Sequence, residues 1–295
     1  MYVKPSSHRI TDAIIGQDDA ELVKSVLTGL SDDGVFRNVH VSISNRLQTV
    51  SQPYTYAVSE GDLLNHYGIL KFGTRTSVAA GVTSVIWEGT AALYTYLTTA
   101  SAMRVVSSSA QDGAGGTGLL TLRLIGLDAN FAEIEEDITL NGVTPVISTK
   151  SFIRIFRAYG LTCGTSYTNV GNINIVDDTT GTIQLLYIPA GDGQTLMTIW
   201  TVPVGKRLHI TNASFSTNSN KGARVSFFTR LLDGGTLYPW RIRYRAFEFS
   251  GNENFPFSVP FVVGAKTDIE VRVLTPGSAG TTSCGATFEG WYEDV

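Results

Sequence analysis

The stretches that decide the fold class are VVSSSAQDGAGGTG (105–118), LRLIGLDANF (122–131) and ITLNGVTPV (138–146). In each of them a short run of alternating apolar and polar residues meets a cluster of Gly, Asn or Asp, which is typical of strands separated by turns. Asp128-Ala129-Asn130 predicts the turn of a hairpin. Asn141-Gly142 is a dipeptide favoured in tight primed turns, whose two central residues need positive φ. We therefore predict antiparallel strands throughout this segment.

Similar runs continue along the chain, with turn signals about every ten residues, as in β-sandwich proteins. The strands expected in the first part are Val85–Trp87, Leu93–Leu97, Met103–Ser107, Leu119–Ile125, Ile134–Leu140, Phe152–Arg157, Ile173–Val176 and Ile183–Ile188. Those expected in the second part are Leu196–Val202, Arg207–Phe215, Arg224–Leu232, Trp240–Phe249, Val259–Val263, Ile269–Val273 and Thr287–Trp291. This pattern predicts a mainly β fold of two β-sandwich, jelly-roll-like modules, 61–190 and 191–295. The hairpin expected at Asp233-Gly234-Gly235 resembles the one at 128–130 and supports two related modules; a single larger sandwich is the alternative.

Residues 1–60 differ from the rest of the chain. Asp18 and Glu21 have capping-box spacing, and a helix is expected over about 19–30. Its apolar face is formed by Leu22, Val23, Val26, Leu27 and Leu30. One strand is expected near 39–43. Because one helix and one strand enclose no core, we predict an N-terminal docking arm held by a neighbouring subunit or by its own body. Leu22, Val26 and Leu30 are the candidate interface residues of this arm.

The composition favours a structural role. The 295 residues carry a net charge of −4, so no broad attraction to nucleic acid is expected. Charged residues make up 16% of the chain, against about 25% in typical soluble domains, which suits a subunit that buries much of its surface. No apolar run approaches the ~20 residues of a membrane span, so no membrane partner is expected. The two cysteines have no metal-site spacing, and free thiols are expected in a chain made in the cytoplasm.

No residue pattern indicates catalysis. The histidines lie in separate segments, without the three or four convergent ligands of a zinc site: they are His8, His40, His66 and His209. No serine lies in a G-x-S-x-G turn. The Gly-rich segment 113–118 lacks the lysine and the helix of a phosphate loop, and we expect a flexible hairpin loop there. We predict no enzyme, no catalytic residue, no cofactor and no metal.

An acidic strand lies between Glu133 and Asp137, in which Glu133, Glu135 and Asp137 share one face. With Asp128 and Asn130 nearby, its oxygens could hold Ca²⁺, which takes six to eight oxygen ligands. The spacing of the known calcium loops is missing. A solvated or interface face is therefore the favoured interpretation.

A basic strand contains Arg241, Arg243 and Arg245, which alternate with Ile242 and Tyr244. Strand periodicity predicts that the three arginines form one ridge, with Ile242 and Tyr244 on the opposite face. Phosphate binding is one interpretation of such a ridge. In a net acidic chain we favour pairing with carboxylates of another strand or subunit, which makes the three arginines candidate interface residues.

Short motifs also occur in a characteristic order over about 57–295. They are Lys71-Phe72-Gly73, Ile86-Trp87-Glu88-Gly89, Tyr94-Thr95-Tyr96, Gly126-Leu127-Asp128, Leu140-Asn141-Gly142, Thr144-Pro145-Val146, and the segments 168–173, 193–197 and 201–206. This order resembles a family of virion structural proteins of tailed bacteriophages. The family's usual pattern is not kept near 74–83, where Thr74-Arg75-Thr76-Ser77 replaces acidic residues.

The resemblance implies a non-enzymatic component of a tailed-phage virion. We expect an accessory or decoration protein of the capsid or neck that assembles through its β-sandwich surfaces. Its expected partners are copies of itself and other virion proteins of the capsid, portal or neck. The alternative is a receptor-binding or carbohydrate-binding component of the tail or fibre. A glycan-cleaving enzyme is disfavoured because long β-solenoid repeats are missing.

Overall fold

The computed structural model describes residues 29–30, 36–37, 54–233, 236–277 and 280–295. It divides the chain into two compact units, Met1–Tyr54 and Thr55–Val295. In the first unit the strands β1 (Gly29–Leu30) and β2 (Phe36–Arg37) pair in antiparallel fashion. The helix predicted over 19–30 is therefore wrong for its last two residues. The rest of that helix, with Leu22 and Val26, and the strand predicted near 39–43 lie outside the described residues.

The second unit is mainly β, as the sequence predicts, because strands make up 58% and helix 3% of the residues that the structure describes. Its only helix among the described residues is α3 (Tyr54–Ser59), which buries Val58. The strands form two β-sandwiches. We call them the inserted sandwich and the host sandwich, because the first is formed by a continuous segment that lies, in sequence, between strands of the second.

The inserted sandwich consists of a four-stranded and a three-stranded sheet, in the orders β11-β10-β5-β8 and β7-β6-β9. Its strands are β5 (Ser101–Ser107), β6 (Leu119–Leu127), β7 (Glu133–Thr139), β8 (Val146–Phe152), β9 (Arg154–Cys163), β10 (Ile173–Asp177) and β11 (Gln184–Ile188). Alternate residues of these strands are buried, as β5 shows most regularly with Met103 and Val105 inside. The same core receives Ile175 from β10 and Leu186 from the edge strand β11.

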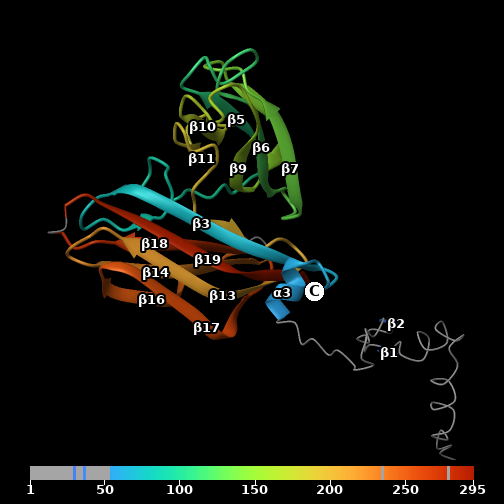
Figure 1. Cartoon of the computed structure of the whole chain (residues 1–295), viewed down its shortest axis with the longest axis vertical. Coiled ribbons are helices and arrows are strands. Elements are labelled where there is room, and N and C mark those ends of the chain that lie inside the picture. The colour runs from blue at the N-terminus through green and yellow to red at the C-terminus, as the bar shows by residue number, and fades with distance from the viewer. Residues whose placement is uncertain (1–28, 31–35, 38–53, 234–235, 278–279) are drawn as a thin grey trace, which may run out of the picture. The chain divides into compact units, whose positions relative to one another are not determined.

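The host sandwich consists of a sheet in the order β17-β13-β19-β3 and a sheet in the order β12-β18-β14, to which β15, β16 and β4 are added. Its strands are β3 (His66–Val78), β4 (Ser84–Val85), β12 (Trp200–Thr201), β13 (Lys206–Thr217), β14 (Ala223–Asp233), β15 (Thr236–Leu237), β16 (Arg241–Phe249), β17 (Gly251–Val263), β18 (Thr267–Leu274) and β19 (Thr282–Asp294). Figure 1 shows β3, drawn in cyan, alongside the red β19. Strand pairing thus joins the N-terminal strands β3 and β4 to the C-terminal ones. The modules 61–190 and 191–295 remain a prediction.

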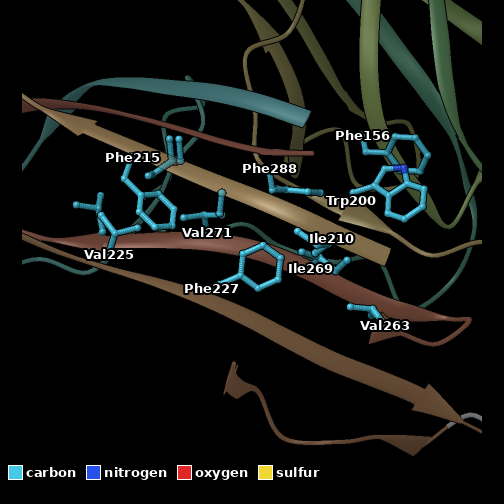
Figure 2. Close-up of a cluster of buried hydrophobic side chains, with 14 of the residues drawn as sticks. Phe156, Trp200, Ile210, Phe215, Val225, Phe227, Val263, Ile269, Val271 and Phe288 are labelled. Carbon is cyan, nitrogen blue, oxygen red and sulfur yellow. The ribbon is translucent and has the colours of Figure 1, made fainter. Parts of the chain in front are cut away.

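The core of the host sandwich lies between its two sheets (Figure 2). Phe227 of β14 meets Phe288 of β19 edge to face, with ring centroids 5.5 Å apart. The core continues toward the inserted sandwich, where Phe156 of β9 contacts Trp200 of β12 at 6.0 Å. The two sandwiches therefore share buried apolar surface, which contributes favourably to their association at about 25 cal/mol per Å².

Two predicted turns differ in outcome. The hairpin at Asp128 is confirmed: the side-chain oxygen Oδ1 accepts hydrogen bonds from the backbone N–H of Asn130 at 2.8 Å and of Ala132 at 2.9 Å. The primed turn centred on Asn141 and Gly142 is wrong. Only Gly142 has positive φ, at 58°, because Asn141 is held in a β-bridge with Gly113.

The strand predicted over Leu93–Leu97 is also wrong, because these residues have no partner strand. The alternation of large apolar or aromatic residues in this segment comes from packing outside a sheet. Tyr94 lies edge to face on Trp87, with ring centroids 5.2 Å apart, and its hydroxyl donates a hydrogen bond to the carbonyl oxygen of Ile155 at 3.2 Å. Tyr96 lies against Tyr94 at 4.8 Å. This extended connection between β4 and β5 brings Tyr96 to the pocket described next.

Candidate functional site

A pocket of 910 Å³ lies where the β4–β5 connection and the β6–β7 turn meet the strands β14 and β18. Both sandwiches contribute to its walls. The inserted sandwich supplies Phe131 and Arg154, and the host sandwich supplies Arg230 and Arg272. The pocket is thus formed only when the two sandwiches are packed together.

Cationic and aromatic side chains alternate around this pocket, and we call them the cation–aromatic ladder. In spatial order the ladder consists of Lys266, Phe131, Arg154, Tyr96, Arg230, Trp240, Arg272 and Phe228. Successive distances from cation to ring centroid are 5.9, 5.4, 5.0, 4.6, 4.5, 4.9 and 4.3 Å. All lie within the ~6 Å over which a cation is attracted to an aromatic face. The rings therefore help to fix the positions of the guanidinium groups.

Asp268 of β18 anchors the middle of the ladder. Its carboxylate is fully buried and accepts hydrogen bonds from Arg154 Nε at 2.7 Å, Arg154 Nη2 at 3.1 Å and Arg230 Nη2 at 2.8 Å. The hydroxyl of Thr201 donates a fourth, at 2.8 Å. Because Arg154 belongs to the inserted sandwich and Asp268 to the host, this ion pair joins the two. A buried charge of this kind is stable only while its partners remain in place.

Glu270 anchors the next part of the ladder, two residues further along β18. It is buried, pairs with Arg272 and accepts a hydrogen bond from the Tyr96 hydroxyl at 2.9 Å. Burial raises the pKa of Glu270 above its ordinary value, despite the attraction of Arg272. Burial, followed by the negative field of Glu270, raises the pKa of Tyr96 well above its ordinary value. The Tyr96 hydroxyl is therefore kept protonated as a hydrogen-bond donor.

Positive charge exceeds negative charge in this cluster. Arg154, Arg230, Lys266 and Arg272 line the pocket, whereas Asp268 and Glu270 are the carboxylates that pair with ladder cations among the described residues. The guanidinium group of Arg154 makes four hydrogen bonds within the protein, because its Nη1 also donates to the carbonyl oxygens of Leu97 and Ile153, both at 2.8 Å. The Nε of Arg230 is buried without a hydrogen-bond partner. Lys266 carries no ion pair to any described carboxylate.

Two of these residues have an unusual backbone. Phe131 has φ of 66° and Lys266 has φ of 55°, in the left-handed region that is uncommon for residues other than glycine. Lys266 is fixed by its backbone: its N–H donates to Val202 O at 2.8 Å, and its carbonyl accepts from Leu232 N at 3.0 Å. Residues held in this region cluster at functional sites, where the surrounding structure imposes the conformation.

The predicted arginine ridge is only partly present. A bulge in the pairing of β16 with β14 sets Tyr244 opposite Phe227 and Ile242 opposite Phe228. Opposite residues of antiparallel strands share a face, so Ile242 and Tyr244 lie on different faces. Arg241 and Arg243 line one pocket, and the Arg243 guanidinium lies 4.5 Å from the Phe261 ring centroid.

Arg245 instead lies opposite Ser226 and donates from Nε to its hydroxyl at 2.9 Å. The prediction of one ridge is therefore wrong for Arg245, because a bulge changes the side-chain alternation. The interface role of the three arginines remains a prediction. For Leu30 the structure describes only its backbone pairing with Phe36.

The acidic strand has partners in its own chain. Arg123 pairs with Glu135 at 3.0 Å and with Asp137 at 2.7 Å. Glu136 accepts the backbone N–H groups of Thr149 and Lys150 at 2.6 and 2.8 Å. Among the described residues no three His, Cys, Asp or Glu side chains gather as a metal site would require. Within the same part of the chain no helix has the length and apolarity of a membrane span.

The Gly-rich loop 113–118 is held by Asp112, which is fully buried. Its carboxylate accepts from Ser107 Oγ at 2.5 Å, Leu119 N at 3.0 Å, Val170 N at 2.9 Å and Gly171 N at 2.8 Å. The hairpin loop predicted from composition is thus tied at its base to neighbouring loops. This arrangement is structural, since every contact named here is internal.

The ladder was not predicted from the sequence. Its members are scattered from Tyr96 to Arg272, and no local motif connects them. One signal was present: Arg154 and Arg230 interrupt strands that otherwise read as buried. A charged residue in a buried strand needs a partner, and Asp268, in the buried strand β18, is that partner.

No protein-family model matches the chain, and a comparison with curated proteins gives no match either. Among solved structures, a structure of the Gt strain of infectious bursal disease virus is similar, with 11% identity, a TM-score of 0.25, and coverage of 78% of this chain and 73% of that chain. The VP2 subviral particle of the same virus has 13% identity and a TM-score of 0.24, covering 79% and 72%. The PBSX exported protein XepA has 9% identity and a TM-score of 0.18, covering 89% and 98%. These low scores support no conclusion about function.

Proposed function

We propose that the chain is a non-enzymatic structural subunit of a virus particle, an accessory or decoration protein of a tailed-phage capsid or neck. One flank of the host sandwich carries this proposal. There β16 and β17 are the edge strands of opposite sheets, β16 pairing with β14 and β17 with β13. Between these edges lies a groove whose walls include Leu231, Tyr238, Arg241, Arg243, Phe261 and Val262. We call it the flank groove.

A protrusion of β17 lies beside this groove. Ile210 of β13 is opposite Phe261, whereas Asn212 is opposite Pro256, so the residues 257–260 form a bulge opposite a single residue of β13. Val259 on this bulge is 80% exposed, and Val262 is also exposed. Exposed apolar side chains next to an apolar groove are typical of a protein–protein interface.

The prolines of β17 favour side-chain contact over sheet extension. Pro256 and Pro260 have no backbone N–H, so they interrupt the edge along which a further strand would pair. We infer that the flank groove of one copy buries the side chains of a partner, and that the partner is a second copy or another virion protein. Residues 1–60 serve in this proposal as a docking arm on the capsid or neck, with Leu22 and Val26 in the contact.

Sedimentation velocity of the full chain tests this assembly. The change Val259→Asp should weaken self-association at least about tenfold, because it places a charge in an apolar contact. Val143→Asp is the matched control, since Val143 is 59% exposed but lies in the inserted sandwich. Equal sedimentation of the unmodified chain and the Val259→Asp variant at all concentrations would contradict self-assembly through the flank groove.

A second candidate function is a receptor-binding or carbohydrate-binding component of the tail or fibre. The observation that favours it is the cation–aromatic ladder with its 910 Å³ pocket. The four tryptophans of the chain do not form an open sugar platform: Trp87 and Trp200 are buried, Trp291 lies stacked on His209 at 4.9 Å, and Trp240 is flanked by two arginines. Any ligand of this pocket is therefore recognised chiefly by charge.

A further inference from the structure

We propose that the pocket beside the cation–aromatic ladder binds a carboxylated saccharide. This inference rests on the second candidate function, which it makes specific, and it is independent of assembly through the flank groove. The pocket has a volume of 910 Å³, which lies within the ~300–1,000 Å³ of small-molecule sites. Its walls come from both sandwiches, so the fold holds the site ready for a ligand.

The charge of the pocket calls for an anion. Lys266 has no carboxylate partner among the described residues, and the buried Nε of Arg230 has no hydrogen-bond partner. The Nε atom itself is closed to solvent, so a carboxylate in the pocket would be attracted by the charge of the guanidinium group as a whole. Hydrogen bonds between a guanidinium or ammonium group and a carboxylate are among the strongest in proteins.

The ladder prepares these cations for binding. Arg230 lies between Tyr96 and Trp240, with ring centroids 4.6 and 4.5 Å from its Cζ, and Asp268 holds its Nη2. Its guanidinium group is therefore held by three neighbours before any ligand arrives. A side chain that is already ordered loses less entropy on binding, which favours affinity.

The aromatic rings disfavour a nucleotide as the ligand. Phe131, Tyr96 and Trp240 each contact two cations already. A base that stacked on one of these rings would have to displace a cation. The rings thus serve to position charge, whereas nucleobase binding commonly uses free aromatic faces.

The remaining wall suits a sugar. Thr98 and the exposed Asn130 bring a hydroxyl and an amide to the pocket, and these groups can both donate and accept hydrogen bonds. Leu93 and Leu237 are exposed apolar side chains at the same pocket. A bare anion would use the cations and leave these groups unused. A saccharide that carries a carboxylate would contact all of them.

Isothermal titration calorimetry of the full chain with trigalacturonate tests the proposal. Saturable binding is expected, and it should weaken as NaCl is raised from about 0.05 M to about 0.5 M because salt screens the charges. Lys266→Gln should lower the affinity about tenfold, since it removes one charge-assisted hydrogen bond. Asn130→Ala should lower the affinity for the saccharide without changing the net charge. Lys221→Gln is the matched control: Lys221 is an exposed lysine of the host sandwich at the β13–β14 turn, and its loss should leave the affinity unchanged.

Three results would overturn the proposal. Maltotriose, a neutral saccharide, binding as tightly as trigalacturonate would show that charge is not recognised. Inorganic phosphate binding as tightly as trigalacturonate, with no effect of Asn130→Ala, would show an anion site that does not recognise the sugar. No binding of trigalacturonate to a folded chain would also contradict it. None of these outcomes changes what the sedimentation experiment should show. A failure of saccharide binding therefore leaves the proposal of assembly through the flank groove standing.

Discussion

Arg154 of the inserted sandwich and Asp268 of the host sandwich form a buried, two-point ion pair, with Nε–Oδ1 at 2.7 Å and Nη2–Oδ2 at 3.1 Å. Both side chains are buried, so neither charge is solvated by water. Arg230 shares the same carboxylate at 2.8 Å. The packing of the two sandwiches therefore depends on charges that must be satisfied together.

Asp268→Asn should destabilise the chain by about 3–5 kcal/mol, because it leaves Arg154 and Arg230 buried without their anion. The free energy of unfolding in urea is the measurement. Asp178→Asn is the matched control, since Asp178 pairs with Arg104 at 2.8 Å but both side chains are partly exposed. An exposed pair contributes about 0–1 kcal/mol. Equal effects of the two changes would show that the buried pair has no special role.

Lys71 should make stability depend on pH. It is buried, its Nζ donates to the carbonyl oxygen of Phe156, and burial followed by the field of Arg157 lowers its pKa from 10.5 to about 7. Between pH 7 and 10.5 the unfolded chain binds the proton and the folded chain does not, so this group makes stability rise with pH, by at most about 1.4 kcal/mol per unit.

Lys71→Met removes this titration. The gain in stability from Lys71→Met, relative to the unmodified chain, should therefore be largest at or below about pH 7 and shrink toward about pH 10. Thermal unfolding at several pH values measures it. Lys150→Met is the control: Lys150 Nζ also donates to a backbone carbonyl, that of Glu135 at 2.7 Å, but at an exposed site. A Lys71→Met effect that does not change with pH would contradict the account.

The contrast between β13 and β3 shows what the sequence could predict. In β13 the inward residues Leu208, Ile210 and Phe215 are apolar, so the pattern predicted the strand closely. In β3 the buried alternate residues are Lys71, Gly73 and Arg75, none of which reads as core. They are buried because they face the inserted sandwich and its connections. That contact is tertiary, so no local sequence pattern predicts it.

Arg75 shows why a buried charged residue is needed in β3. Its Nη1 donates to the carbonyl oxygens of Trp87, Gly89 and Ala91 at 3.2, 3.1 and 3.1 Å, which fixes the segment after β4. The candidate site was hidden for the same reason, since the ladder is brought together only by the packing of two sandwiches. The bulge that separates Arg245 from Arg243 likewise has no sequence signal, because side-chain alternation assumes regular pairing.

Gly73 should be the least replaceable glycine of β3. A Cβ at this position would lie 2.7 Å from backbone atoms of Met197 and Thr198. The segment before β12 would therefore have to move away from β3 to accommodate it. Gly73→Ala should cost about 1–3 kcal/mol through overpacking. Gly68→Ala in the same strand is the control, because a Cβ there meets no atom within 4 Å. Urea unfolding of both variants decides between steric conflict and a general preference for glycine in the strand.

A reconstruction of the intact virus particle tests the central claim most directly. The account predicts that the chain occupies a defined place in the particle, with the flank groove and Val259 buried against a second copy or another virion protein. A reconstruction in which the flank groove and Val259 face solvent in every copy, or a complete particle that lacks the chain, would contradict it.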